Sequence, residues 1–240
     1  MRHTKYIGLI GLAALTGLTS ACTPDDPGES PRTPLYRWGQ EGEPSSGERG
    51  ALMITEINFA GSITDDGTWD ADDVFIELQN KHPRPINVSG WHLIIEGDVV
   101  ATHRIPTLED PIQPNDYLVV ARKKDGAFGE AADVFIDNLE LGTNRVKIEL
   151  RDHDLRLMES AGSEEEEVFA GGWDTVTVRS MERVELIFGN RGETSRNWHA
   201  YSDTVGFDTI KEGYRKHTLA SPGEANSADY SGSSTSGNFE

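Results

Sequence analysis

Two groups of residues in this sequence have the side chains and the spacing to do chemistry. The first ends at Cys22, the single cysteine of the 240-residue chain. A basic start with Arg2 and Lys5, an apolar stretch over residues 6–18 and small residues before the cysteine form a secretion signal with its cleavage site. A cysteine in this place is typical of bacterial lipoproteins, whose thiol receives a diacylglycerol. We therefore expect cleavage before Cys22 and attachment to a membrane through it.

The signal departs from the usual lipoprotein pattern at one position. Thr19, rather than leucine, stands three residues before Cys22. An ordinary cleaved signal and an uncleaved anchor stay open as alternatives, although a spanning helix needs about 20 apolar residues. Two or three acyl chains would anchor the chain stably. Because Thr23 follows the cysteine where Asp would favour the inner membrane, the expected location is the outer membrane of a bacterial envelope, facing the periplasm or the surface.

The second group is an acidic loop at residues 64–73, with five aspartates and Gly67. Carboxylate oxygens in a flexible loop suit Ca²⁺, which prefers oxygen ligands. The loop lacks the spacing of an EF-hand, and a solvated acidic loop is the alternative. If calcium binds, it should raise the melting temperature. The expected ligands are Asp65, Asp70, Asp72 and Asp73.

Other catalytic and metal-binding motifs are missing from the sequence. None of the seven histidines has a close partner of the kind that makes a metal site, and no second cysteine could supply a thiolate for zinc. The sequence contains no nucleophile elbow, phosphate-binding loop or dinucleotide motif. We therefore expect no enzyme activity.

The charge excludes one class of partner. The chain has a net charge of −19, and loss of residues 1–21, with Arg2 and Lys5 but no acid, changes it to −21. Such a surface repels phosphates, so we expect no direct binding of nucleic acid. Divalent cations or a basic partner fit better.

Composition divides the chain into four parts. Residues 1–21 are the signal peptide, residues 22–50 a flexible tether rich in Pro and Gly, residues 51–226 the folded domain, and residues 227–240 a polar tail. The tether and the tail lack the apolar residues of a core and are expected to be disordered. Three residues of the tether are unusual there and either pack on the domain or form a short adhesive motif: Leu35, Tyr36 and Trp38.

Between the tails the pattern predicts β-structure. Residues 145–150 alternate strictly between apolar and polar and are expected to pair with residues 155–157 across a turn. Polar connections separate these short runs, and no long apolar period of 3.6 residues occurs, so a sandwich or barrel is indicated. The acidic run 164–167 is expected to be disordered, or a docking patch for a basic partner. Further strands are expected at 52–57, 74–78, 91–95, 117–121, 175–178 and 184–187.

Short motifs in the same order resemble those of bacterial lamin-tail domains. They are ITEIN at 54–58, DVFIELQN at 73–80, PINVSGWHL at 85–93, IQPNDYLV at 112–119, SMERV at 180–184, NW at 197–198 and SPGEAN at 221–226. The order and spacing hold over residues 51–226. Two departures are Ser221, where the motif has Thr, and a long acidic insertion at residues 158–172. The resemblance implies an all-β, immunoglobulin-like sandwich that serves as an interaction module, and it implies structural roles for the motif residues.

Together these features predict a lipid-anchored envelope protein with one lamin-tail domain that binds another protein or a glycan, as in adhesion. A calcium-stabilised structural module and an accessory subunit of a secreted hydrolase are the alternatives. A binding module should expose an apolar or aromatic patch, for which Trp38 and Trp69 are candidates. A calcium module should bring carboxylates together, and an enzyme should have a pocket with a perturbed titrating group.

Overall fold

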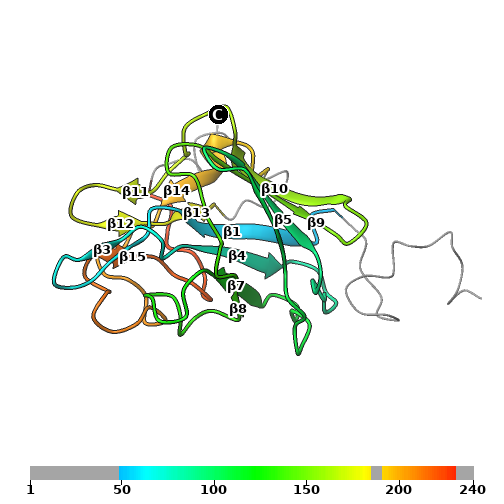
Figure 1. The fold of residues 1–240 in the computed structure, drawn as a ribbon, viewed down its shortest axis with the longest axis horizontal. Coiled ribbons are helices and arrows are strands. Elements are labelled where there is room, and N and C mark those ends of the chain that lie inside the picture. The colour runs from blue at the N-terminus through cyan, green and yellow to red at the C-terminus, as the bar shows by residue number, and fades with distance from the viewer. Residues whose placement is uncertain (1–48, 185–190, 231–240) are drawn as a thin grey trace, which may run out of the picture. The chain divides into compact units, whose positions relative to one another are not determined.

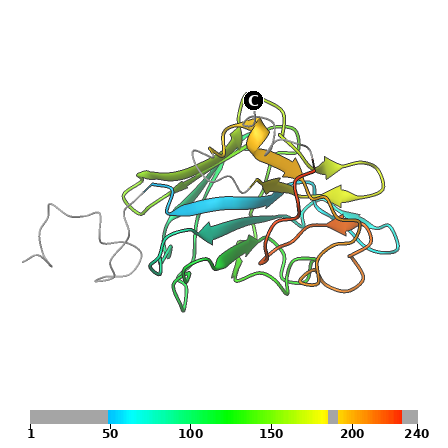
Figure 2. The ribbon, with the colours of Figure 1, turned by 180° about the vertical axis from the view of Figure 1, so that it is seen from behind.

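The computed structural model describes residues 49–184 and 191–230, whose regular secondary structure is almost wholly β-strand (Figures 1 and 2). All of them belong to one compact unit, residues 34–240. In these ranges the only helical segment is a 3₁₀ turn, Ser195–Asn197. The all-β prediction is therefore confirmed. Within the same ranges, no helix is long and apolar enough to cross a bilayer. Cys22 lies outside the described residues.

The largest sheet has six strands in the order β14-β13-β1-β4-β7-β8. Its neighbouring strands are antiparallel, except that β8 runs parallel to β7. The strands are β1 (Leu52–Asn58), β4 (Phe75–Asn80), β7 (Tyr117–Ala121), β8 (Val134–Phe135), β13 (Met181–Arg183) and β14 (Trp198–Ala200).

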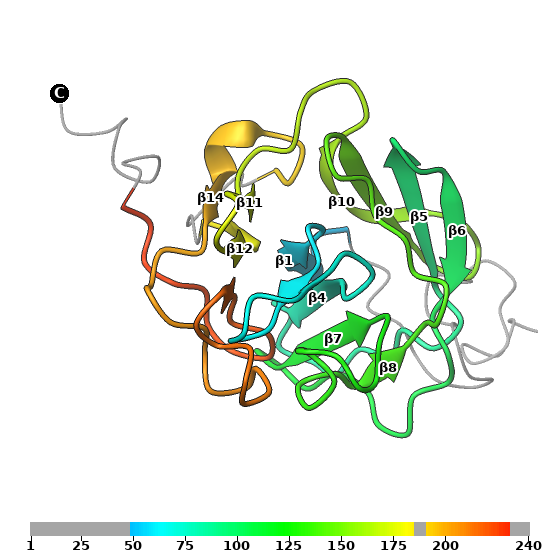
Figure 3. The ribbon, with the colours of Figure 1, turned by 60° about the vertical axis from the view of Figure 1, so that its left-hand side comes forward.

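A four-stranded antiparallel sheet, in the order β10-β9-β5-β6, stands beside it (Figure 3). Its strands are β5 (His92–Gly97), β6 (Ala101–Arg104), β9 (Val146–Arg151) and β10 (Leu157–Ser163). Two smaller sheets complete the fold. One joins β11 (Gly172–Trp173), β12 (Val178–Arg179) and β15 (Thr218–Leu219), and the other is the hairpin of β2 (Ser62–Ile63) and β3 (Trp69–Asp70).

The two larger sheets share one hydrophobic core. In β9 the predicted alternation is present: Val146, Ile148 and Leu150 are buried in the core, and Lys147 pairs with Glu149 at 3.3 Å on the other face. A hairpin of β9 with β10 is present as predicted, but its second strand is Leu157–Ser163 rather than residues 155–157. The six-stranded sheet adds apolar residues of β1, β4 and β7 to the same core: Ile54, Ile57, Ile76, Leu78, Leu118 and Val120.

A β-bulge in β1 lets Ile54 and Ile57 share the core although they are three residues apart. In a regular strand such residues point to opposite faces of the sheet. The register of β1 against β4 shifts between Ile54 and Glu56, which returns Ile57 to the core. Glu56 then lies on the far face of the sheet, between Glu77 of β4 and Glu182 of β13.

The far face of the six-stranded sheet is also buried, which explains why every residue of β4 is inaccessible. Loops cover one part of it with a second apolar cluster, in which the rings of Phe75 and Phe128 lie 4.6 Å apart. The rest of the cluster is Val119, Ala121, Ala127, Ile210 and Ala220. The other part of this face carries the three glutamates.

Gly90 makes the turn that delivers Trp91 to the core. It has a φ of +78°, which a residue with a side chain adopts only at a cost. Trp91 then donates its backbone N–H to Val88 O at 3.0 Å, and its side chain is fully buried in the main core. Both residues of this motif therefore have structural roles, as the sequence analysis expects of the motif residues.

Two sequence-based expectations differ from the structure, and a third is not tested by it. Residues 175–177 form the turn between β11 and β12 and not a strand, because Asp174 accepts the N–H groups of Val176 and Thr177. The run 164–167 forms a turn after β10, with Ser163 Oγ accepting two of its N–H groups. The strand expected at 184–187 lies mostly outside the described residues.

We predict that Trp91→Ala lowers the free energy of unfolding by about 3–5 kcal/mol, because it leaves a cavity in the main core. Urea denaturation measures the change. Trp173→Ala, which removes a half-exposed ring, is the matched control and should cost much less. Equal losses in the two variants would contradict the core assignment.

Candidate functional site

The structure does not gather the four aspartates that the sequence predicts as calcium ligands. Arg122 Nη1 lies 2.9 Å from Asp72 Oδ1, and Lys123 Nζ lies 2.6 Å from both carboxylate oxygens of Asp70. Asp65 instead accepts the backbone N–H of Lys216 at 3.1 Å. Each of these three carboxylates therefore has its own basic partner.

The fourth aspartate, Asp73, is fully buried and joins two segments of the fold. Its Oδ2 accepts the hydroxyl of Ser62 and the N–H of Ala127, each at 2.6 Å. Burial raises the pKa of Asp73, and these two hydrogen bonds oppose the shift. Across residues 49–184 and 191–230, no group of three or more His, Cys, Asp or Glu side chains could hold a metal ion. The geometry thus provides no ligand set for calcium.

Two exposed tryptophans from separate hairpins stack on each other. The ring centroids of Trp69 and Trp173 lie 4.8 Å apart, with an interplanar angle of 11°. The residues keep 44% and 50% of their surfaces exposed, and Val176 in the next turn is also exposed. We call Trp69 and Trp173 the tryptophan pair. Stacking of aromatic rings adds stability beyond the area that it buries. The contact between the two rings therefore helps to hold both side chains in place on the surface.

Each ring of the pair is held by its own hairpin. Trp69 Nε1 donates to Ala60 O at 2.9 Å, which fixes the ring against the start of the β2–β3 hairpin. The β2–β3 turn is closed by hydrogen bonds of Asp66 with Thr68, and the β11–β12 turn by those of Asp174 with Thr177. The two hairpins therefore present the rings in a defined position.

One residue of β15 joins the two hairpins. Thr218 Oγ1 accepts the N–H of Ile63 in β2 and donates to the Ile63 carbonyl, both at 2.8 Å. Thr218 also pairs with Val178 of β12 in parallel register. Because β2 belongs to the hairpin of Trp69 and β12 to that of Trp173, the position of the tryptophan pair depends on β15.

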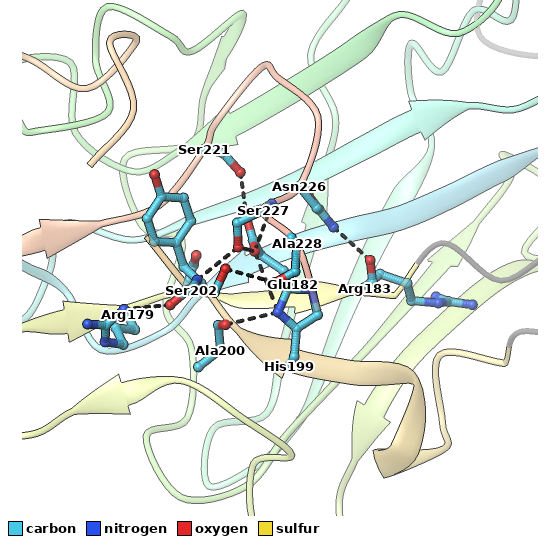
Figure 4. A network of polar contacts seen from close by, with 12 residues as sticks. Arg179, Glu182, Arg183, His199, Ala200, Ser202, Ser221, Asn226, Ser227 and Ala228 are labelled. Atoms are coloured by element: carbon cyan, nitrogen blue, oxygen red, sulfur yellow. Dashed lines mark hydrogen bonds and ion pairs between the residues drawn. The ribbon is translucent and has the colours of Figure 1, made fainter. Parts of the chain in front are cut away.

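The chain that follows β15 makes hydrogen bonds to three buried glutamates, and Figure 4 shows Ser221 and Ser227 around one of them, Glu182. We call residues 221–227 the C-terminal strap. Ser221 donates its N–H to Glu56 Oε1 at 3.0 Å and its hydroxyl to Glu182 Oε1 at 2.6 Å. Gly223 N–H donates to Glu77 Oε2 at 2.7 Å. Every glutamate of the row thus holds the strap.

The end of the strap is bound equally closely. The N–H of Ser227 lies 3.1 Å from both oxygens of Glu182, and its hydroxyl donates to the same carboxylate. Asn226 Nδ2 donates to the carbonyls of Thr55 and Arg183 at 3.0 and 2.9 Å (Figure 4). This side-chain amide fastens the strap across β1 and β13.

Burial raises the pKa values of all three glutamates, and repulsion from neighbouring carboxyls adds to the shift in Glu56 and Glu77. Burial is the largest cause in each, and it raises the pKa of Glu77 to about 8. The pKa of Glu56 lies well above its ordinary value because of burial and the nearby carboxyls of Glu182 and Glu77. The pKa of Glu182 is raised too, although the hydroxyls of Ser221 and Ser227 oppose the shift. The protonated form of these carboxyls is therefore favoured in the folded protein.

One cluster has the residue types of a hydrolytic site, but a substrate cannot reach it. The cluster is Ser221, Ser227, Glu182 and His199. His199 Nδ1 lies 2.9 Å from the carbonyl of Ala200 and 3.8 Å from Glu182 Oε2. Glu182, His199 and Ser221 are all buried. A substrate would have to displace the strap to reach them, so the arrangement fits a structural clasp.

The remaining motif residues near this row are structural as well. Arg183 is buried, pairs with Glu159 at 2.8 Å and lies 5.4 Å from the ring centre of Trp198. Its Nη1 also donates to Ile54 O. The arginine and the tryptophan of the two late motifs thus contact each other directly.

A groove of about 780 Å³ runs beside β7 and β8, lined by residues 106–113, 116–118 and 133–135. Burial raises the pKa of Asp133 in its wall. The carboxylate of Asp133 accepts the N–H of Val119 at 2.8 Å, which binds β7 to the chain entering β8. The residues that line the groove include no histidine, serine or cysteine.

Sequence reasoning missed the two features that dominate the site. Glu56, Glu77 and Glu182 stand in the quoted motifs, but each looks like an outward polar residue until the strand register aligns them. Trp173 stands two residues before a predicted strand, and no sequence signal places it against Trp69. Asp66 and Asp174 carry an Asx-turn pattern that could have marked both turns.

Comparison with known proteins adds little to this picture. No family model matches the chain. Over 88 residues, or 37% of this chain, the sequence is 26% identical to a Pseudomonas sp. protein named 2-hydroxy-6-oxononadienedioate/2-hydroxy-6-oxononatrienedioate hydrolase. The match spans 31% of that hydrolase. Since the chain covers less than a third of that protein's length, the similarity carries no argument about activity.

We predict that the protein loses stability as the pH rises from about 4.5 to about 8. Below this window both states hold the Glu77 proton. Within it the unfolded chain, at its ordinary pKa of 4.5, releases the proton and the folded state retains it. Stability therefore falls by at most about 1.4 kcal/mol per pH unit for each such group. Urea denaturation between pH 4 and 9 measures this slope.

Glu77→Gln isolates the contribution of one carboxyl to the slope. The amide oxygen can accept from Gly223 N–H and the amide nitrogen can donate to the Thr55 hydroxyl, so the strap keeps its contacts. We expect a shallower pH slope than in the wild type. Glu165→Gln, at an exposed position, is the control and should keep the full slope. An unchanged slope in Glu77→Gln would refute the raised pKa.

We also predict that millimolar calcium, compared with EDTA, leaves the melting temperature unchanged. Asp70 and Asp72 already have Lys123 and Arg122 as partners, and an ion would have to displace both. Differential scanning fluorimetry measures the shift. A rise that Asp70→Asn abolishes would restore the calcium site.

Proposed function

We propose that this chain is a lipid-anchored protein of the bacterial envelope, whose folded part is a lamin-tail, immunoglobulin-like module that binds a partner. The tryptophan pair carries the proposal. Exposed apolar patches on a soluble domain mark interaction sites, and tryptophan is enriched at the energetic centres of interfaces. Trp69 is one of the residues that the sequence offers for such a patch.

The rigidity of the pair favours binding over chance exposure. Two half-exposed indoles, each fixed by a hairpin and both tied to β15, are already ordered before a partner arrives. Association then costs less conformational entropy than it would for loose side chains. A surface without a binding role has no need to hold two tryptophans in stacked contact at the ends of different strands.

The contacts of the quoted motifs support the family assignment. The glutamates of ITEIN, DVFIELQN and SMERV all hold the strap formed by SPGEAN. Such a dependence between four distant motifs is what a shared fold requires. Two antiparallel-rich sheets around one core are consistent with an immunoglobulin-like sandwich.

The N-terminal signal and Cys22 supply the anchor in this proposal. A flexible tether over residues 22–50 has an end-to-end span of about 30 Å, enough to hold the module clear of the lipid headgroups. The tryptophan pair would then meet a protein or another envelope component within that reach.

We predict that the double variant Trp69→Ala/Trp173→Ala stays folded and anchored but loses its partner. Crosslinking with mass spectrometry on intact cells should reveal crosslinked species in the wild type that this variant lacks. Cys22→Ala should release the protein from the membrane fraction, which tests the anchor separately.

Val100→Ser is the matched control, because Val100 is 83% exposed and lies in the turn between β5 and β6. It should keep the crosslinks of the wild type. If the double tryptophan variant keeps every crosslink too, the pair is not the binding surface and the proposal fails.

A further inference from the structure

The tryptophan pair leaves flat aromatic faces open, and this limits what it can bind. The two rings are nearly parallel with centroids 4.8 Å apart, so no group fits between them. An aromatic cage around a compact ammonium ion needs rings that converge on it. A planar group that lies on an outer indole face suits this geometry better.

Two aspartates in the turns of the two hairpins, Asp66 and Asp174, form no ion pair within the described residues. Among the described residues no ion pair joins Asp66 or Asp174 to a basic side chain, whereas Asp65, Asp70 and Asp72 each have one. Hydrogen bonds from Thr64 and Thr68 lower the pKa of Asp66, and backbone N–H groups of the β11–β12 turn lower that of Asp174. Both carboxylates are therefore ionised at neutral pH.

The basic residue that acts on Asp174 is committed elsewhere. Arg179 helps to lower the pKa of Asp174, but its Nη1 donates to the carbonyls of Tyr201 and Asp203 at 2.6 and 3.1 Å. Asp174 itself immediately follows Trp173, and Asp66 lies three residues before Trp69 in the other hairpin. Each ring therefore has in its own turn a carboxylate that forms no ion pair with a described basic side chain.

The charge of the whole chain acts in the same direction. A net charge of −19 draws basic partners toward the surface and repels acidic ones. Guanidinium groups combine the required properties, because they are planar, stack on aromatic faces and donate to carboxylates. An ammonium group can do only the last of these well.

We propose that the tryptophan pair and the carboxylates of Asp66 and Asp174 together bind a basic protein segment, with an arginine guanidinium lying on an exposed indole face. This inference rests on the proposed function and names the chemistry of its partner. A glycan would also stack on indole and donate hydroxyl groups to the carboxylates, but a neutral sugar lacks the charge attraction that a guanidinium has for them.

The test uses the folded protein and a synthetic peptide of Gly and Ser with three arginines. A second peptide with citrulline in place of each arginine keeps the shape and removes the charge. We expect the arginine peptide to change the indole fluorescence and the citrulline peptide to bind at least about tenfold more weakly. The affinity should fall as salt is raised.

Variants separate the local charges from the general field of the protein. Asp66→Asn/Asp174→Asn retains oxygen acceptors for both turns and should weaken the arginine peptide at least about fivefold. Glu165→Gln/Glu166→Gln removes the same number of charges from the exposed run after β10 and should change affinity less than twofold. Trp69→Ala/Trp173→Ala should abolish binding, and circular dichroism verifies folding.

Three outcomes overturn the inference: equal binding of the citrulline peptide, an equal loss in the glutamine control, or binding of a neutral chitin or cellulose oligosaccharide but not of the arginine peptide. Each leaves the proposed function intact if cell crosslinks still require the tryptophans. Loss of the proposed function itself would instead appear as unchanged crosslinks in the double tryptophan variant.

Discussion

The structure depends on the burial of Glu182, Glu56 and Glu77 in one row across the six-stranded sheet. Three carboxyls in an apolar setting are tolerable only if donors satisfy them or protons neutralise them. The C-terminal strap supplies the donors, and the raised pKa values favour the protons. In return the row fixes the path of the strap, and the strap closes a sheet face that loops cover only in part.

This constraint reaches the surface through β15. The strap begins just after Thr218 and Leu219, which bind the hairpins of Trp69 and Trp173. The interior row and the exposed aromatic pair are therefore attached to one short stretch of chain. The same stretch of chain covers the buried glutamates through the strap and holds the two tryptophan hairpins through β15.

Local pattern predicted much of the fold and little of the site. Strict alternation in Val146–Leu150 encoded a half-buried strand, and Gly90 before Trp91 encoded a turn into the core. The glutamate row could not be read in this way, since it depends on a bulge in β1 and on pairing across four distant segments. The acidic loop misled because its basic partners, Arg122 and Lys123, lie about fifty residues away. The composition of a segment shows how many charges it carries, but it does not show which distant residues lie beside them in the fold.

The hydrogen bonds between the strap and the row have a consequence for biosynthesis. The contact of Ser221 with Glu56 joins residues 165 positions apart, so the partner of an early strand leaves the ribosome long after the strand itself. Until then three acids lack their donors and the sheet face stays open. The domain therefore cannot complete its interior until residues 221–227 have been made.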